Sequence, residues 1–220
     1  PHGSSSENIL AGRPDDVCYS CHSGLESEFL KTNIHKPVQN GQCTACHLGH
    51  GADNALMLKA QGETLCETCH EKTPFREESA TIHMPYDDGE CMTCHNPHAS
   101  DNEGVTTEPQ KQLCLSCHSD FEDQMLNATS QHLPATVGQC SKCHNPHQSK
   151  LGSLLLAESP DLCLVCHTEL QTKMSEEKSH SPAERDCQRC HQPHSASLDT
   201  LLTLPLQALC GECHEPDASS

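Results

Sequence analysis

Apolar residues fall into short groups along a mostly polar chain, and the clearest groups repeat at a helical spacing. Because residues four apart share one face of a helix, these pairs predict short helices. The pairs are Leu25 and Phe29, Phe121 and Met125, and Leu170 and Met174. Each predicted helix ends near a proline, a residue that cannot continue a helix. These prolines are Pro37, Pro134 and Pro182.

The second repeat departs from this pattern because Pro74 intrudes, so we expect its helix to start late or be short. No stretch of the chain shows a β pattern of alternating apolar and polar residues. The predicted fold class is therefore mostly irregular chain with short α-helices.

A doublet repeat of 47–49 residues organises the chain, because nine cysteine motifs begin at intervals of 25, 23, 25, 23, 26, 23, 24 and 23 residues. Motifs of two types alternate. First-type motifs, each preceded by an apolar residue, begin at Cys18, Cys66, Cys114, Cys163 and Cys210. Second-type motifs begin at Cys43, Cys91, Cys140 and Cys187. Three of these follow a turn, Gly41-Gln42, Gly89-Glu90 and Gly138-Gln139, and Arg185-Asp186 is the departure.

This repeat predicts five segments along the chain. They are 1–42 with one motif, 43–90, 91–139 and 140–186 with two motifs each, and 187–220 with two. Eight and nine residues before the first Cys of most first-type motifs lies a mostly apolar pair, which we interpret as core. These pairs are Ile9-Leu10, Met57-Leu58, Leu154-Leu155 and Leu201-Leu202.

Composition shows that side chains alone cannot build a large interior. Apolar residues are 34% of the chain, aromatics are 2% and there is no Trp, yet the chain holds 18 Cys and 18 His. So little apolar surface cannot offset the entropy of ordering the chain. The net charge of −18 excludes nucleic acid and an anionic membrane surface as partners, since both require a basic patch. No apolar run is long enough for direct membrane insertion.

All 18 cysteines lie in C-x-x-C-H motifs, the attachment signature of c-type haem. Two thiols on one turn reach the haem vinyl groups as thioethers, and the adjacent His lies under the iron as proximal ligand. Zinc sites or disulfides would not explain why His follows the second Cys every time. The nine motifs, numbered as haems 1 to 9 in chain order, are Cys18-Cys21-His22, Cys43-Cys46-His47, Cys66-Cys69-His70, Cys91-Cys94-His95, Cys114-Cys117-His118, Cys140-Cys143-His144, Cys163-Cys166-His167, Cys187-Cys190-His191 and Cys210-Cys213-His214.

Nine histidines remain, as many as nine six-coordinate irons need for distal ligands. They are His2, His35, His50, His83, His98, His132, His147, His180 and His194. Five of them lie 16 residues before the first Cys of a first-type motif, and the other four lie 8 or 7 residues before a second-type motif. This phase favours iron ligation over a solvated surface role. The five methionines keep no phase with the motifs, which indicates packing.

Two assignments of these distal ligands fit the spacing. His47 and His50 lie too close together to bind one iron from opposite faces, so the second His must serve another haem. The simpler assignment follows chain order, from His2 with haem 1, His35 with haem 2 and His50 with haem 3 to His194 with haem 9. The rival gives His35, His83, His132 and His180 to the haems just upstream, and it leaves haem 9 without a ligand in this chain.

With these motifs the chain resembles the doubled-CXXCH multihaem cytochromes c, which include periplasmic carriers, outer-membrane conduits within porins and extracellular filaments. The resemblance implies covalent haem c, bis-His iron and export to the periplasm or the cell exterior. It implies as partners other redox proteins, a porin or copies of the same chain. The opening Pro1-His2 matches the end of a second-type motif, as in Asn96-Pro97-His98. We therefore expect either a longer parent chain with a tenth motif or cleavage at that point.

Two functions compete for such a chain. One is electron transfer through nine bis-His haems, with no catalytic residue. The alternative is a multihaem reductase for nitrite, hydroxylamine or sulfite, which needs one iron with an open face. Every motif here ends in His, nine spare His are available and only 13 Lys and Arg are present to attract small anions. These features favour electron transfer over an enzyme, with haem order following chain order.

Overall fold

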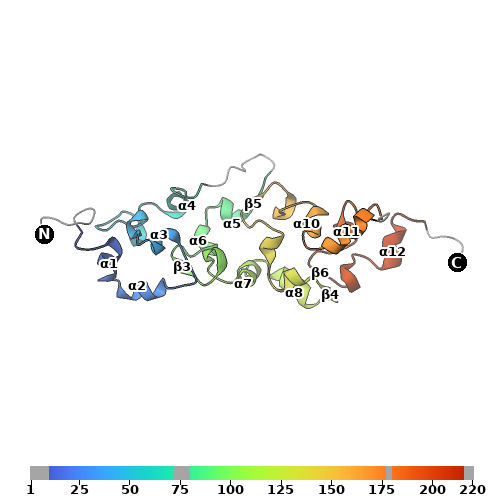
Figure 1. The fold of residues 1–220 in the computed structure, drawn as a ribbon, viewed down its shortest axis with the longest axis horizontal. Coiled ribbons are helices and arrows are strands. Elements are labelled where there is room, and N and C mark those ends of the chain that lie inside the picture. Colours follow the sequence, from blue (N-terminus) through green and yellow to red (C-terminus); the bar gives the residue numbers. More distant parts are fainter. Residues whose placement is uncertain (1–9, 72–79, 177–179, 216–220) are drawn as a thin grey trace. The chain divides into compact units, whose positions relative to one another are not determined.

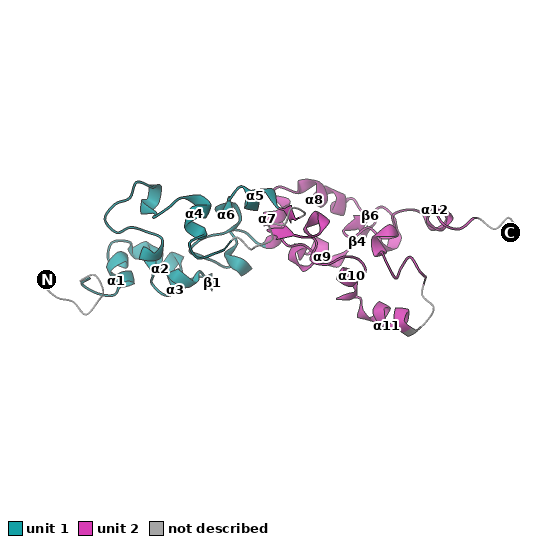
Figure 2. Ribbon diagram, turned by 90° about the horizontal axis from the view of Figure 1, so that it is seen from above, with its two compact units in different colours: residues 1–76, 83–109 teal, residues 77–82, 110–220 magenta. Residues whose placement is uncertain are grey.

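The computed structural model describes residues 10–71, 80–176 and 180–215. Figure 1 shows short helices and turns joined by irregular chain, as the sequence predicts. Two compact units are formed, one by residues 1–76 with 83–109 and the other by 77–82 with 110–220 (Figure 2).

The first unit contains six short helices among its described residues. They are α1 (Pro14–Tyr19), α2 (Ser23–Glu28), α3 (Lys36–Gln39), α4 (Gly62–Cys66), α5 (Met84–Asp87) and α6 (Cys91–Cys94). Three 3-10 turns join them: η2 (Cys43–Ala45), η3 (Ala55–Met57) and η4 (Glu103–Val105). Strand β1 (Asn33–Ile34) pairs antiparallel with β3 (Ala99–Ser100).

The second unit repeats this plan in its described residues. Its helices are α7 (Gln110–Leu115), α8 (Ser119–Leu126), α9 (Leu133–Thr136), α10 (Asp161–Leu164), α11 (Thr168–Glu176) and α12 (Leu206–Gly211). Its 3-10 turns are η5 (Cys140–Lys142), η6 (Gly152–Leu154), η7 (Cys187–Arg189) and η8 (Asp199–Leu201). Antiparallel pairs join β2 (Thr81–Ile82) to β5 (Gln148–Ser149) and β4 (Ser130–Gln131) to β6 (Ser195–Ala196).

The helices predicted after first-type motifs are confirmed as α2, α8 and α11, but the role predicted for the prolines is wrong. Helix α2 ends at Glu28 and α8 at Leu126, well before the prolines. Pro37 and Pro134 lie instead in the first turns of α3 and α9. A first-turn residue needs no backbone N–H, so proline begins a helix there. Pro74 lies outside the described residues.

The structure also contains strands, although no stretch of the sequence shows an alternating β pattern. Each strand is only two residues long, too short for an alternating pattern to register in the sequence. The register pairs Ile34 with Ala99 and Gln131 with Ser195. These ladders join residues from different doublets, and a histidine follows each of β1, β2 and β4 directly.

Side chains contribute little to the interior. Among the described residues, the buried apolar side chains are Ala99, Met125 and Ala196, and two of the three lie in strands. Among the apolar pairs predicted as core, the described residues are only partly covered, and Met57 is 40% exposed. Ile9 lies outside the described residues. In the described part of the chain, no helix combines the length and apolar character needed to cross a membrane.

Candidate haem-binding sites

All nine C-x-x-C-H motifs adopt the same local turn. In each, the backbone N–H of the His donates to the carbonyl of the first Cys at 2.9–3.1 Å, which closes one helical turn. The turn places two thiols and an imidazole on one short segment, as attachment to a single haem requires. None of the 18 cysteines forms a disulfide. Among the described residues, no three His, Cys, Asp or Glu side chains converge as a metal-ion site would require.

In the described part of the chain, proximal histidines of five motifs are seen opposite a second imidazole. Their ring centroids are 5.8 Å apart for His35 and His70, 6.1 Å for His47 and His98, 6.2 Å for His132 and His167, 6.0 Å for His144 and His194, and 6.0 Å for His180 and His214. A ring nitrogen binds a first-row metal at about 2 Å, so two rings across one iron place their centroids about 6 Å apart. These pairs therefore fit bis-His ligation of haem iron.

The chain-order assignment of distal ligands is wrong for these five pairs, and its rival is wrong for His35, His132 and His180. His35 faces His70 of haem 3, whereas the two assignments gave it to haem 2 or haem 1. His98 faces His47 of haem 2, and His194 faces His144 of haem 6. His132 and His180 likewise face haems 7 and 9. The partners come from neighbouring doublets, because the strand ladders bring those doublets together.

A simple register describes the pairs. A His that precedes a second-type motif faces the proximal His of the next first-type motif, 35 residues downstream for His35 and His132. A His that follows a second-type motif by three residues faces the proximal His of the preceding second-type motif. That separation is 51 residues for His98 and 50 for His194.

The ladders hold the distal imidazoles in place. The backbone N–H of His35 donates to the carbonyl of His98 at 2.8 Å, and His132 donates to His194 at 2.9 Å. The Nδ1 atoms of His35 and His132 lie 2.8 Å from the carbonyls of Pro97 and Pro193. A carbonyl can only accept, so Nδ1 carries the proton and Nε2 is left for iron.

A second set of carbonyls orients the proximal histidines of the second-type motifs. Each Nδ1 lies 2.7–2.9 Å from the carbonyl of the residue nine positions later. These acceptors are Leu56, Gly104, Ser153 and Thr200, with φ of +56°, +68°, +53° and +54°. Left-handed backbone is costly for a residue with a Cβ, and such strain often marks a functional position. This contact was not predicted from the sequence. Of the four acceptor residues, only Gly104 is of a type that favours left-handed backbone.

Aromatic side chains pack on two of the predicted distal histidines. Phe29, at the end of α2, stacks on His98 with centroids 4.8 Å apart. Phe121 of α8 meets His194 edge-on at 5.2 Å. Burial is the main reason that the pKa of His98 and of His194 is lowered, which favours the neutral imidazole that binds iron. The predicted helices thus cover ligands of haems other than their own.

Within each unit, consecutive motifs lie next to each other. Helix α1 packs against η2, and α7 packs against η5. The first thiols of these motifs lie close enough to shift each other's pKa. The thiol pairs are Cys18 with Cys43, Cys66 with Cys91, Cys114 with Cys140, and Cys163 with Cys187. Cys143 also lies near Cys166, and the guanidinium of Arg189 lies 3.5 Å from the sulfur of Cys213.

Glycines make this approach possible. Gly41, Gly89 and Gly138 have φ of +67°, +73° and +80°, and their Cα atoms face a side chain three residues before a first-type motif. A Cβ on Gly138 would lie 2.4 Å from the Cβ of Lys111. The fourth second-type motif has Arg185-Asp186 in place of the glycine turn. There, Ser159 Oγ accepts from the N–H of Cys187, and the Asp186 carboxylate accepts from the N–H of Gln188.

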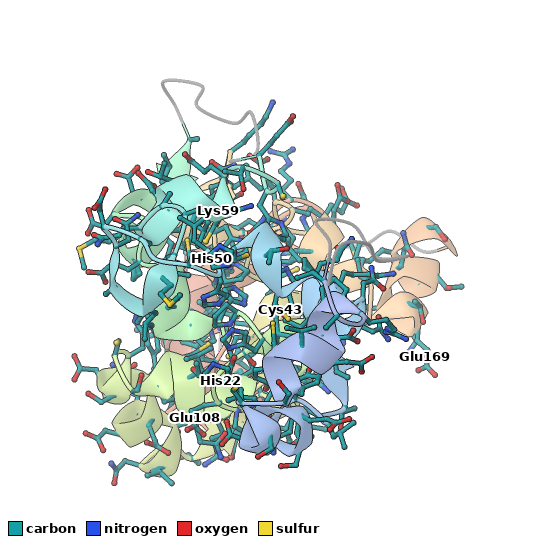
Figure 3. All side chains as sticks on the ribbon, turned by 90° about the vertical axis from the view of Figure 1, so that its left-hand side faces the viewer. His22, Cys43, His50, Lys59, Glu108 and Glu169 are labelled. Atoms are coloured by element: carbon teal, nitrogen blue, oxygen red, sulfur yellow. The ribbon has the colours of Figure 1, made fainter. Side chains whose placement is uncertain are left out.

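Four other predicted distal histidines remain: His2, His50, His83 and His147. His2 lies outside the described residues. His83 directly precedes α5, and His147 directly precedes β5. His50 follows the second motif in an exposed loop. Figure 3 shows the side chains of His22, Cys43 and His50 in the first unit. Within the described parts of the chain, no imidazole faces His22, His50 or His191.

Comparison with known proteins agrees with this geometry. The family model described as the doubled CXXCH motif matches four stretches, residues 35–75, 83–123, 132–172 and 180–219. These stretches begin at the predicted distal histidines His35, His83, His132 and His180. Their boundaries differ from those of the five predicted segments, which stay a prediction. No curated protein matches the chain. The matched stretches cover more than half of the 220 residues, and the chain belongs to the doubled-CXXCH family of c-type, haem-binding electron-transfer cytochromes.

Proposed function

We propose that the chain holds nine c-type haems in the order of its motifs and conducts electrons along them. The observation that carries this proposal is the contact between elements of consecutive motifs within each unit, such as α1 with η2 and α7 with η5. Because these elements carry the cysteines of consecutive motifs, the haems attached to them would be neighbours as well. When bound, haem c supplies reversible one-electron transfer at its iron.

The residues of the chain bind, orient and enclose this cofactor. Each C-x-x-C-H turn presents two thiols and a proximal imidazole. The carbonyls that accept from Nδ1 fix the orientation of the ring and raise the basicity of the ligand. Phe29 and Phe121 cover distal imidazoles and exclude water beside them. Five opposing imidazole pairs support six-coordinate iron, which has no face for a substrate.

The proposal places the protein outside the cytoplasm, as a periplasmic, outer-membrane-conduit or extracellular cytochrome, and gives it no enzymatic activity. Its partners are other redox proteins, a porin or further copies of the chain, reached by haem-to-haem contact. The net charge of −18 supports a redox partner that presents a basic face.

The test combines haem counting with turnover. Intact mass and a haem assay on the denatured protein are expected to give nine covalent haems and no reactive thiol. A reductive titration is expected to take up nine electrons per chain. A lower haem count, or catalytic reduction of nitrite, hydroxylamine or sulfite, would overturn the proposal.

A further inference from the structure

Arg189 holds a positive charge against the attachment site of the next haem along the chain. The residue lies in the eighth motif, between Cys187 and Cys190, at the end of η7. Its guanidinium lies 3.5 Å from the sulfur of Cys213, the second cysteine of the ninth motif. In the described part of the chain, Arg189 forms no ion pair, so no carboxylate there neutralises its charge.

The half-repeat that carries Arg189 also supplies the axial partner at the ninth motif. His180, seven residues before Cys187, faces His214 with ring centroids 6.0 Å apart. Residues 180–191 therefore reach the ninth motif twice, through a guanidinium at a sulfur and through an imidazole opposite the proximal one. These two contacts fix the haem site of the ninth motif beside Arg189.

The position of Arg189 carries a graded charge along the four second-type motifs. The residue just before the second Cys is, in chain order, Ala45, Thr93, Lys142 and Arg189. It is uncharged in the first two motifs and positive in the last two. The third and ninth motifs form a matched pair for this position, because each contains one glutamate between its cysteines. The residue ahead of them, alanine or arginine, is where their charges differ.

A fixed positive charge beside a haem favours its reduced state. Reduction adds one electron, so a nearby cation stabilises the product more than the reactant. Arg189 contacts a sulfur through which the haem is attached, whereas the rest of the chain provides an acidic background with a net charge of −18. Glu212, inside the ninth motif, acts in the opposite sense to Arg189.

We propose that Arg189 sets the reduction potential of haem 9 and raises it above that of haem 3, where Ala45 takes the place of the arginine. Electrons then pass from the third motif toward the ninth with a favourable free energy, which gives conduction a direction. Arg189 binds no haem itself and acts as a positioning residue for charge. This inference rests on the proposed haem c function, and haem counting tests that function separately.

The experiment is a spectropotentiometric titration of the haem-loaded chain at low salt, where an exposed charge is least screened. Arg189→Gln is expected to lower one of the nine potentials. The expected change is on the order of tenfold in the equilibrium constant for reduction, about 59 mV for one electron. Arg189→Lys, which keeps the charge, is expected to retain most of the potential. The matched control Arg185→Gln removes the same charge from a side chain with no sulfur contact, and a much smaller shift is expected.

Removal of single haems assigns the potentials. Comparison with a Cys210→Ala, Cys213→Ala chain gives the potential of haem 9, and a Cys66→Ala, Cys69→Ala chain gives that of haem 3. In the chain without haem 9, Arg189→Gln is expected to shift no potential.

Haem count and low-spin spectra are expected to be the same in Arg189→Gln as in the unmodified chain. The proposal would be overturned by nine unchanged potentials in Arg189→Gln, by an equal shift in Arg185→Gln, by a shift that persists without haem 9, or by a haem 9 that titrates below haem 3. Fewer than nine haems in the unmodified chain would count against the proposed function instead.

Discussion

Gly138 allows two consecutive haem motifs to approach closely, because it has no Cβ, so the variant Gly138→Ala tests whether that approach stabilises the fold. The residue has φ of +80°, and an added Cβ would lie 2.4 Å from the Cβ and 2.9 Å from the Cα of Lys111. The second contact is with backbone, so α7 would have to shift away from η5. That shift would separate Cys114 from Cys140.

The expected magnitude follows from three effects. A Cβ in left-handed backbone costs about 1–2 kcal/mol. Overpacking against a neighbouring backbone costs about 1–3 kcal/mol. Replacing glycine also lowers the conformational entropy of the unfolded chain, which stabilises the folded state by about 0.4–1 kcal/mol. We therefore expect Gly138→Ala to lower the free energy of unfolding by about 2–4 kcal/mol.

Denaturant unfolding of the haem-loaded protein measures this difference. The matched control is Gly24→Ala in α2, where no atom lies within 4 Å of the added Cβ. This control is expected to be neutral or stabilising by up to about 1 kcal/mol. The magnetic coupling between the haems at these two motifs is expected to weaken in Gly138→Ala only. Equal stabilities for the two variants would refute the reasoning that Gly138 sets the approach of the motifs.

Three further predictions concern strain, ligand pairing and charge. Thr200→Gly is expected to raise the free energy of unfolding by about 1 kcal/mol, because Thr200 has φ of +54°; a lower melting temperature would contradict this. His35→Ala is expected to create one high-spin iron in resonance spectra. In a background where Cys66→Ala and Cys69→Ala have removed the haem at His70, the same substitution is expected to have no effect. The rate of reduction by a basic redox partner, followed by stopped flow, is expected to fall as salt rises, given the net charge of −18. A salt-independent rate would contradict docking by charge.

The nine motifs and the helices after first-type motifs could be predicted because their determinants are local. A C-x-x-C-H turn closes on itself through one hydrogen bond, from His22 to Cys18 for example. The spacing of Phe121 and Met125 defines one helix face without reference to the rest of the chain. The two-residue strands left no such signal, because two residues cannot show a period.

The sequence by itself determined where the C-x-x-C-H motifs lie, how many there are and the doublet in which they repeat. Only the tertiary structure decided which distal imidazole faces which proximal one. His35 faces His70 rather than His47 because β1 pairs with β3 and fixes His35 beside His98. The carbonyls of Leu56 and Thr200 became Nδ1 acceptors through left-handed backbone, which residue type does not reveal. Covalent attachment depends on neighbours in the chain, whereas ligation across an iron depends on neighbours in space.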